Sequence, residues 1–412
     1  MTTPSRQAGV VFVLPTTTEG QLGPVAGWIS TSGWAAAAER VVGHAWVVTP
    51  HGVLDIETVR ERAARRPSAE TSSRVPGGRS LLRATPLPVK TAVKDAREWQ
   101  RARRFHVEAN GPWCSEDTHV EFVWQRHELF HTAGVELARK LGVPSVVFVP
   151  AVHVWQGQQW GVKRPGWASQ LERRGEQPAL HAATVVACGT DLVAEQVLRL
   201  GVDPERVLIT PTGVDLDRFT PPPEGKDVRA RLGLDGKVVI GWAGSFRGFH
   251  VVEQLVAAAP RMPETVLLLV GDGPQRARIE ALVAAAGIEA VFTGTVPAAE
   301  LPRHLAAMDV GVVMADPRSF YYSPLKLAEY LAAGLPVVAP DVAPLGKLLD
   351  PGGNAVLYPA GKVGALHRAL TDLATDAPRR ERLRAGALAS ASQWSWDEQV
   401  RRVRAAIASL RR

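Results

Sequence analysis

The chain has 412 residues, of which 46% are hydrophobic and 22% charged, so it has enough apolar surface to exclude bulk disorder. Cys114 and Cys188 could form at most one bridge, which excludes a disulfide scaffold, and the net charge of +7 favours anionic partners. No apolar run reaches the roughly 20 residues of a spanning helix, and residues 9–15 lack the features of a signal peptide, so we expect a cytoplasmic protein.

The first half of the chain alternates short β-branched runs with helical stretches. Strands are predicted at 9–15, 44–50, 119–124, 144–150 and 183–188, and helices at 34–41, 57–66, 131–141 and 190–200. Continuous apolar strands that alternate with helices are typical of a parallel sheet covered on both faces. The polar segment 66–80, which Gly and Pro interrupt, is predicted to be a mobile loop or an excursion from the first domain.

The second half repeats this alternation more regularly. Strands are predicted at 238–244, 265–273, 290–296, 309–315, 336–340 and 354–359. Such a pattern indicates a doubly wound α/β domain. Three successive prolines in the segment between the halves can continue neither a helix nor a central strand. The predicted parts are an N-terminal domain 1–219, a linker 220–227, a C-terminal domain 228–392 and a helix 393–412 that returns toward the N-terminal domain.

The segment 316–340 carries the clearest chemical signal. Ser323 and Pro324 are typical of the N-cap and first residue of a helix, and free backbone N–H groups at that end attract anions. Lys326 in the first turn is unfavourable unless an anion binds there, which points to a phosphate. Glu329, one turn further on, could accept two ribose hydroxyls. The alternative is a surface Lys–Glu pair at i,i+3.

The segment 241–250 ends a predicted strand and begins a helix, so it lies where ligands bind in open α/β sheets. Arg247 could reach a diphosphate from the side opposite Lys326; the alternative is an exposed loop arginine. The Gly-Asp-Gly turn at 271–273 has no glycine-rich fingerprint after it. No Asp-x-Asp pair stands at a strand end, and His and Cys lack metal-ligand spacing, so no metal is expected.

Several segments in order resemble one enzyme family. They are 209–221, 241–250, 267–283, 291–316 and 323–339 in the second half, with looser matches at 122–150 and 185–207. From about 119 to 400 the chain resembles retaining GT-B glycosyltransferases of family 4. The resemblance implies two Rossmann-like doubly wound α/β domains that face each other across a cleft. It also implies a nucleotide-diphospho-sugar donor, no cofactor and no metal.

The resemblance assigns roles to residues of the donor side. Glu329 matches the second Glu of the family's E-x7-E motif, whereas Tyr321 occupies the position of the first. Ser245 stands where many members have Arg, so the phosphate-neutralising role falls to Arg247 and Lys326, the predicted catalytic residues together with His153. The predicted donor-binding residues are Gly23, Gly244, Ser245, Val296, Tyr321, Tyr322, Ser323, Pro324, Leu325 and Glu329.

The first half is expected to hold the acceptor. Arg126 and His127 follow one predicted strand, and the loop after the next strand holds His153, Trp155 and Trp160. These positions at carboxyl ends of strands are where ligands bind in such sheets. Arg126, His127, Trp155 and Trp160 are the predicted acceptor-binding residues. For His153 a catalytic and a structural role both stay open.

The function that these features favour is a metal-independent retaining transfer of a sugar from a UDP- or GDP-linked donor. The expected acceptor is a small molecule of bacterial specialised metabolism. The alternatives are a lipid-linked or cell-envelope acceptor, or a GT-B-like sugar-nucleotide epimerase. A nucleic-acid partner is not expected, because basic residues are dispersed among acids. A Rossmann dehydrogenase is not expected either, because neither half has G-x-G-x-x-G after a first strand. We expect a monomer or homodimer; peripheral membrane contact stays open.

Overall fold

The computed structural model describes residues 7–16, 25–64, 86–220, 222, 224–260, 262, 264–316 and 325–411. Two compact units form within the chain. Unit 1 contains residues 1–211 and 396–412, and unit 2 contains residues 212–395. The boundary therefore precedes the proline-rich segment 220–227, because Val214 pairs with Ser395 and Phe219 is buried in the core of unit 2. The predicted loop 66–80 lies outside the described residues.

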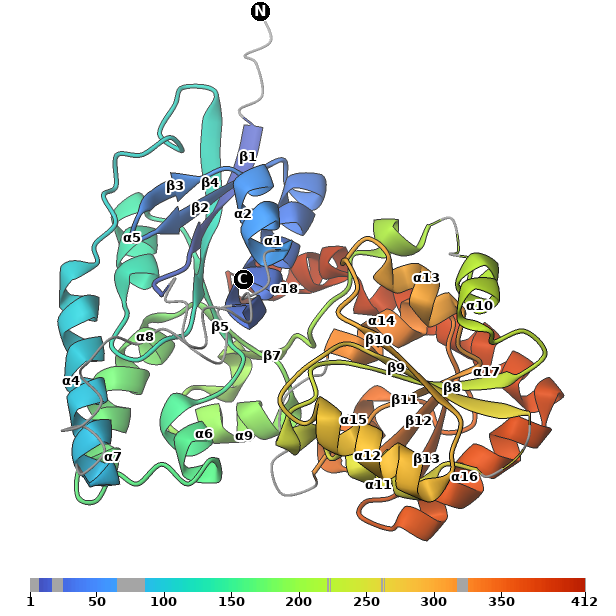
Figure 1. The fold of residues 1–412 in the computed structure, drawn as a ribbon. Coiled ribbons are helices and arrows are strands. Elements are labelled where there is room, and N and C mark those ends of the chain that lie inside the picture. Colours follow the sequence, from blue (N-terminus) through green and yellow to red (C-terminus); the bar gives the residue numbers. More distant parts are fainter. Residues whose placement is uncertain are drawn as a thin grey trace, which may run out of the picture. The chain divides into compact units, whose positions relative to one another are not determined.

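Unit 1 is built on a seven-stranded sheet in the order β3-β2-β1-β4-β5-β6-β7, in which only β3 is antiparallel (Figure 1). The strands are β1 (Gln7–Val13), β2 (His44–Thr49), β3 (Gly52–Leu54), β4 (Thr118–Arg126), β5 (Ser145–Val149), β6 (Val185–Cys188) and β7 (Val207–Ile209). The helices are α1 (Val25–Val41), α2 (Ile56–Ala64), α4 (Leu87–Arg104), α5 (Ala133–Leu141), α6 (His153–Gln159), α7 (Ala168–Leu171), α8 (Gln177–Ala182), α9 (Asp191–Arg199) and α18 (Trp396–Leu410).

The sheet of unit 1 is buried on both faces, which explains why its strands read as continuous apolar runs. Side chains alternate along β1: Val10 and Phe12 join the core beneath α1 and α18, whereas Val11 and Val13 join the core beneath α5. Trp396 of α18 lies with its ring centroid 5.8 Å from that of Trp34 in α1. The last helix thus packs into unit 1 although unit 2 precedes it in the chain.

Unit 2 has a six-stranded parallel sheet in the order β10-β9-β8-β11-β12-β13 (Figure 1). The strands are β8 (Val238–Ala243), β9 (Thr265–Val270), β10 (Ala290–Gly294), β11 (Val310–Val312), β12 (Val337–Asp341) and β13 (Ala355–Pro359). The helices are α10 (Lys226–Leu232), α11 (Val252–Ala258), α12 (Arg276–Ala286), α13 (Leu301–Ala306), α14 (Leu325–Ala332), α15 (Ala343–Leu348), α16 (Val363–Thr375) and α17 (Ala377–Ser390).

The strand order of unit 2 reverses between β8 and β11, the point at which open α/β sheets bind ligands. The two faces of the sheet again carry separate cores. Val239 and Ala243 of β8 face α14, while Ile240 and Trp242 face α11, α12 and α16. The predicted doubly wound α/β architecture is confirmed, and every predicted strand is present; β3 and β7, of three residues each, were not predicted.

Candidate active site

A buried ammonium lies at the switch point of unit 2. Lys326 belongs to the first turn of α14, and its Nζ lies 4.6 Å from the ring centroid of Trp242, near the end of β8. Although the residue keeps some exposure, Nζ itself is buried and has no hydrogen-bond partner among the described residues. Burial lowers the pKa of Lys326 to about 7, and nearby Glu329 opposes that shift. The aromatic face thus holds a cation to which no other described residue offers a hydrogen bond.

His250 lies beside this ammonium in the loop that follows β8. Its Nε2 is 3.5 Å from Oγ of Ser245, and its ring meets the Trp242 ring edge-on at 5.6 Å. Burial, then the charges of Lys326 and Arg247, lower the pKa of His250 far below its usual range. Arg247 is half-buried in the same loop. The structure therefore brings Arg247, Lys326 and Ser245 together around a neutral histidine.

Two glycines allow the neighbouring loop to pack against this one. Gly271 has φ +125°, and a Cβ there would lie 2.0 Å from the Gly244 carbonyl oxygen. A Cβ on Gly244 would in turn lie 3.1 Å from Nζ of Lys326. Gly244 thus leaves the space that the ammonium occupies. The glycines of the Gly-Asp-Gly turn at 271–273 therefore allow the two loops to approach closely.

Glu329 is buried one turn after Lys326 on α14. Burial raises its pKa, while Arg218 and Lys326 act to lower it, and its Oε1 lies 3.6 Å from Nη1 of Arg218. The next residue, Tyr330, fixes the helix to the sheet, because its hydroxyl accepts a hydrogen bond of 2.8 Å from the backbone N–H of Ala243. The helix that carries Lys326 and Glu329 is therefore held directly against the carboxyl end of β8.

Of the other predicted donor-binding residues, only Val296 and Leu325 lie within the described part of the chain. Val296 follows β10 and is buried in the core of unit 2, and Leu325 begins α14 half-buried. The remaining predicted residues lie outside the described part of the chain: Gly23, Tyr321, Tyr322, Ser323 and Pro324. The predicted N-cap at Ser323 thus stays a prediction.

In unit 1 a second buried polar cluster follows β4. Nε2 of His127 lies 2.6 Å from Oε2 of Glu176, and both side chains are fully buried. Glu176 ends a π-helical turn, Glu172–Glu176, and accepts a 2.7 Å hydrogen bond from the backbone N–H of Val154 in α6. Burial alone would raise the pKa of Glu176, but His127, His153 and this N–H outweigh it and lower the pKa. His127 supports the site from beneath rather than facing solvent.

His153 is the first residue of α6 and remains partly exposed. Its Nε2 lies 3.3 Å from Oε2 of Glu128 and 3.2 Å from the backbone oxygen of His127. Two acceptors at one nitrogen favour the tautomer that carries its proton at Nε2. Arg126 pairs with Oε1 of Glu128 at 3.2 Å. Burial acts to raise the pKa of Glu128, but His153 and Arg126 outweigh it, so the carboxylate stays ionised beside His153.

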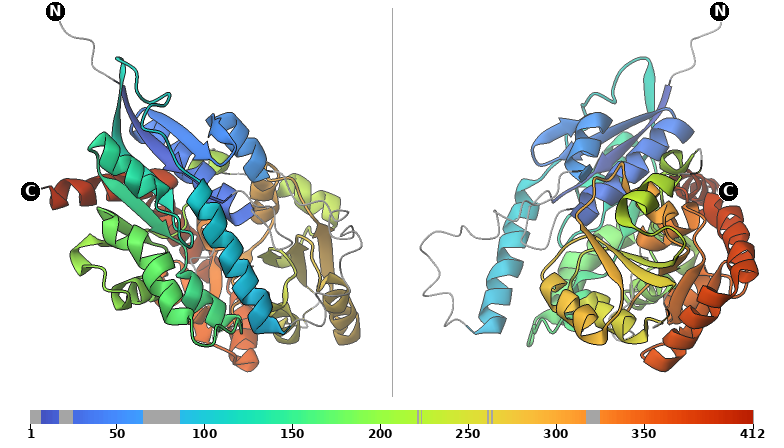
Figure 2. Two further views of the ribbon diagram at one scale, coloured as in Figure 1. Left: turned by 90° about the vertical axis from the view of Figure 1, so that its left-hand side faces the viewer. Right: turned by 45° about the vertical axis from the view of Figure 1, so that its right-hand side comes forward.

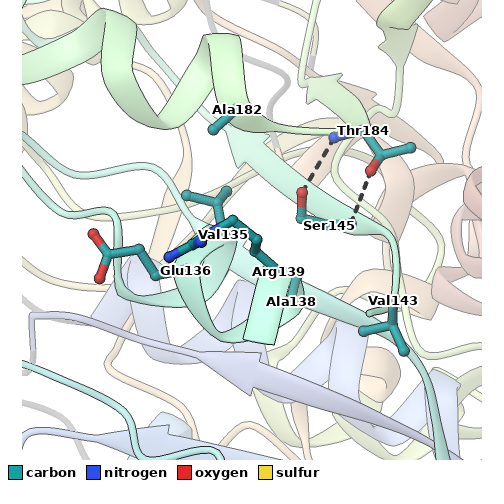
Figure 3. Close-up of a pocket in the computed structure, with 8 residues that line it drawn as sticks. All are labelled: Val135, Glu136, Ala138, Arg139, Val143, Ser145, Ala182 and Thr184. Atoms are coloured by element: carbon teal, nitrogen blue, oxygen red, sulfur yellow. Dashed lines mark hydrogen bonds between the residues drawn. The ribbon is translucent and has the colours of Figure 1, made fainter. Parts of the chain in front are cut away.

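The two predicted tryptophans differ in their exposure. Trp155 is half-buried within α6, while Trp160 follows the opposite end of that helix and is 63% exposed. Figure 3 shows a separate pocket, which α5 lines with Ser145 and Thr184. Ser145 begins β5, so this pocket lies at the amino edge of the sheet, about 15 Å from its carboxyl edge at the rise of a strand. It is therefore no part of the candidate site.

No cluster of three or more His, Cys, Asp or Glu side chains in the described ranges could hold a metal ion. No helix in the part of the chain that the structure describes is long and apolar enough to cross a bilayer.

Comparisons with known proteins decide the family. Residues 237–376 match the family model described as glycosyl transferases group 1. The 2-deoxystreptamine glucosyltransferase of Streptomyces kanamyceticus is 30% identical over 293 residues, an alignment that covers 65% of this chain and 69% of that enzyme. The chain is a group 1 glycosyltransferase. The 2-deoxystreptamine N-acetyl-D-glucosaminyltransferase of Streptomyces fradiae is 29% identical to this glycosyltransferase over 349 residues, which cover 82% of this chain and 78% of that enzyme.

The fold of this glycosyltransferase is GT-B. HepE of Anabaena, solved in complex with UDP, superimposes with a TM-score of 0.61 at 17% identity, over 96% of this chain and 99% of HepE. The expected family, fold and enzyme class are thereby confirmed. The roles of individual site residues stay predictions.

Sequence reasoning missed several residues that shape both clusters. Glu128 could have been found, because it directly follows the predicted His127. Arg218 also lies in a segment that the family resemblance covers, 209–221. Glu176 had no signal, since its place depends on a π-helical turn. Trp242 and Tyr330 read as ordinary core residues, and only the fold places their polar or aromatic faces at the site.

Proposed function

We propose that this glycosyltransferase binds a UDP- or GDP-linked sugar through unit 2 and needs no metal ion. The observation that carries the proposal is the buried ammonium of Lys326 at the switch point, which has no hydrogen-bond partner among the described residues and lies with Arg247 and His250 beside it. A buried charge without a partner costs free energy, and a diphosphate would supply the missing counter-charge. The complex of the GT-B protein HepE with UDP makes UDP the first nucleotide to test.

The sugar is proposed to be transferred with retention of configuration. In this step the acceptor oxygen bonds to C1 of the sugar on the face from which the diphosphate leaves. The bond from C1 to the diphosphate oxygen breaks with both electrons, and the acceptor proton passes to the diphosphate. Lys326 and Arg247 would stabilise the charge that grows on this leaving group. No carboxylate base is required.

The donor proposal is tested by a thermal-shift panel of UDP, GDP and ADP. One base should stabilise most strongly, by about 2.7 kcal/mol at a hundredfold excess over its Kd. The matched control is Lys326→Met, which keeps the aliphatic stem against Trp242 and removes the ammonium. If no nucleoside diphosphate raises the Tm of the wild-type chain, the donor proposal is refuted.

We also propose an amine-bearing small molecule as the acceptor. Both Streptomyces relatives are named for transfer to 2-deoxystreptamine, and the ionised Glu128 beside His153 offers the negative charge that an ammonium group needs. Mass spectrometry of reactions with 2-deoxystreptamine and UDP-glucose tests this acceptor, and proton NMR of the product tests retention. Glu128→Gln should raise the acceptor KM more than it lowers kcat. A product of inverted anomeric configuration would refute retention.

The compartment and assembly follow as smaller proposals. Cys114 is exposed and free, and Cys188 is buried and free, with burial raising the pKa of its thiol to about 12. An exposed free thiol suits a reducing compartment, so we propose the cytoplasm. A monomer or homodimer is the proposed state in solution.

A further inference from the structure

Helix α4 of unit 1 carries three parallel stripes of different character. The packed stripe consists of Thr91, Asp95, Glu98 and Ala102. The basic stripe consists of Lys90, Lys94, Arg97, Arg101 and Arg104. The apolar stripe consists of Val89, Ala92, Val93, Ala96 and Trp99. Each stripe repeats at intervals of three and four residues, so each follows one face of the helix. Only the first face is buried in unit 1.

The packed stripe fixes the orientation of the other two. The buried carboxylate of Asp95 accepts two hydrogen bonds from Arg164, of 2.9 and 3.1 Å, and a third of 3.1 Å from Nε1 of Trp167. A bidentate arginine pair constrains direction as well as distance. Figure 2 shows α4 in cyan along the outer edge of unit 1. The helix therefore presents its apolar and basic faces in a set direction.

The apolar stripe has no place in a core. Ten large apolar side chains are exposed in the part of the chain that the structure describes, and α4 carries four of them. Three of them belong to the apolar stripe, Val89 at 48%, Val93 at 46% and Trp99 at 45% exposure, and the fourth is Leu87, the first residue of the helix, at 55%. Helix α18 has a similar amphipathic and basic sequence, but its apolar stripe is buried against α1. Packing thus accounts for the pattern of α18 and leaves that of α4 unexplained.

The charge of α4 indicates the chemistry of what covers it. Six basic and two acidic residues give the helix a charge of +4, more than half of the chain's +7. Both acids already have partners, Asp95 in Arg164 and Glu98 in Arg101 and His131. Lys90, Lys94, Arg97 and Arg104 form no ion pair with any described residue. A partner for this face is therefore anionic and apolar at once.

We propose that α4 lies flat on an anionic lipid bilayer. Its apolar stripe would enter the headgroup region, and the adjoining basic stripe would meet the lipid phosphates. With 18 residues the helix is about 27 Å long, and its charges suit a helix that lies on a membrane rather than one that spans it. The Arg103 guanidinium lies 4.9 Å from the ring centroid of Trp99. An aromatic ring with a polar group beside it is typical of the tryptophans found at membrane interfaces. This inference is independent of the proposed donor and acceptor.

The test is co-sedimentation of the full-length protein with vesicles of phosphatidylcholine, with and without 30% phosphatidylglycerol, at 100 mM NaCl. The wild-type chain should bind the anionic vesicles and bind the neutral ones far more weakly. A variant with Lys94→Gln, Arg97→Gln and Arg104→Gln should bind about 100-fold more weakly, at about fivefold for each basic residue. The matched control changes Arg379, Arg382 and Arg384 of α17 to Gln, the same loss of charge, and should keep its binding.

A further variant with two substitutions tests whether the apolar stripe inserts into the bilayer. Val93→Gln with Trp99→Gln keeps every charge and should also weaken vesicle binding, whereas binding unchanged by this variant would overturn the inserted stripe. Wild-type protein that stays in the supernatant with anionic vesicles would overturn the proposal outright. Light scattering could also overturn it, by showing a dimer that the α4 substitutions dissociate while vesicle binding is retained. The face would then be a contact between two copies of the chain. Circular dichroism and Tm confirm that each variant is folded.

Discussion

The affinity for UDP should fall steeply as pH rises above neutrality. Burial holds the pKa of Lys326 at about 7 in the free protein, against a reference of 10.5. A bound diphosphate favours the ammonium and raises that pKa again, so binding takes up a proton wherever the free amine is neutral. Affinity is then fully present below about pH 7 and is lost as pH rises through that value. Between pH 7.5 and 9.5 the loss approaches tenfold per unit, about 2.7 kcal/mol in all.

Isothermal titration calorimetry measures both parts of this prediction. Titrations in buffers of different ionisation enthalpy count the protons taken up, which should approach one per UDP at pH 8.5. The pH window avoids the last ionisation of the nucleotide's own phosphate, near about 6. Lys326→Arg is the control, because a guanidinium stays charged throughout and should flatten the pH dependence. A wild-type affinity that stays constant within twofold over this window, without proton uptake, would refute the reasoning.

Four further predictions concern stability, binding and metal. Lys326→Met should raise the free energy of unfolding at pH 7 by up to about 4 kcal/mol. Between pH 7 and 10.5 the unfolded chain binds more protons than the folded one, so the free energy of unfolding of the wild type rises with pH. The stability difference between Lys326→Met and the wild type therefore shrinks toward pH 10. Urea unfolding of both proteins at pH 7 and at pH 10 measures this difference. Tyr330→Phe should lower that free energy by about 1–3 kcal/mol, since the buried N–H of Ala243 loses its acceptor; an unchanged urea midpoint would contradict this. Glu329→Ala should weaken UDP binding by about 1.5–3 kcal/mol without loss of helical circular dichroism, and equal affinity would remove its proposed ribose contact. Transfer activity should survive EDTA, whereas loss that Mg²⁺ restores would contradict metal independence.

The architecture was readable from the sequence because both sheets are buried on both faces. Strands such as β9 appear as uninterrupted apolar runs, and a parallel sheet requires the helices that alternate with them. The same logic placed Arg247 in the segment that follows the carboxyl end of β8, where the structure has it. The unit boundary was less accessible, because prolines in 220–227 mark a break in secondary structure and not a break in packing.

Local spacing could not reveal side chains that act through contacts distant in sequence. Glu176 reaches His127 across 49 positions, and Tyr330 reaches Ala243 across 87. No period of 2 or 3.6 residues encodes such distances. Likewise, Trp242 has the expected alternation of a buried strand, and nothing in that pattern shows that a lysine would lie over its ring. His127 shows the same limit, since its position after a strand did not disclose that it is fully buried.

The return of α18 to unit 1 has a consequence for how the chain is made. Unit 2 is in effect an insertion, so the ribosome must complete all 184 residues of 212–395 before the final helix of unit 1 emerges. Until then Trp34 and the small surface at Gly33, where a Cβ would lie 2.2 Å from the Trp396 indole, lack the cover that Trp396 provides. An N-terminal fragment that stops at Pro211 therefore lacks one wall of its own core. Adding residues 396–412 as a separate peptide should restore it, much as a split protein is complemented by its missing segment.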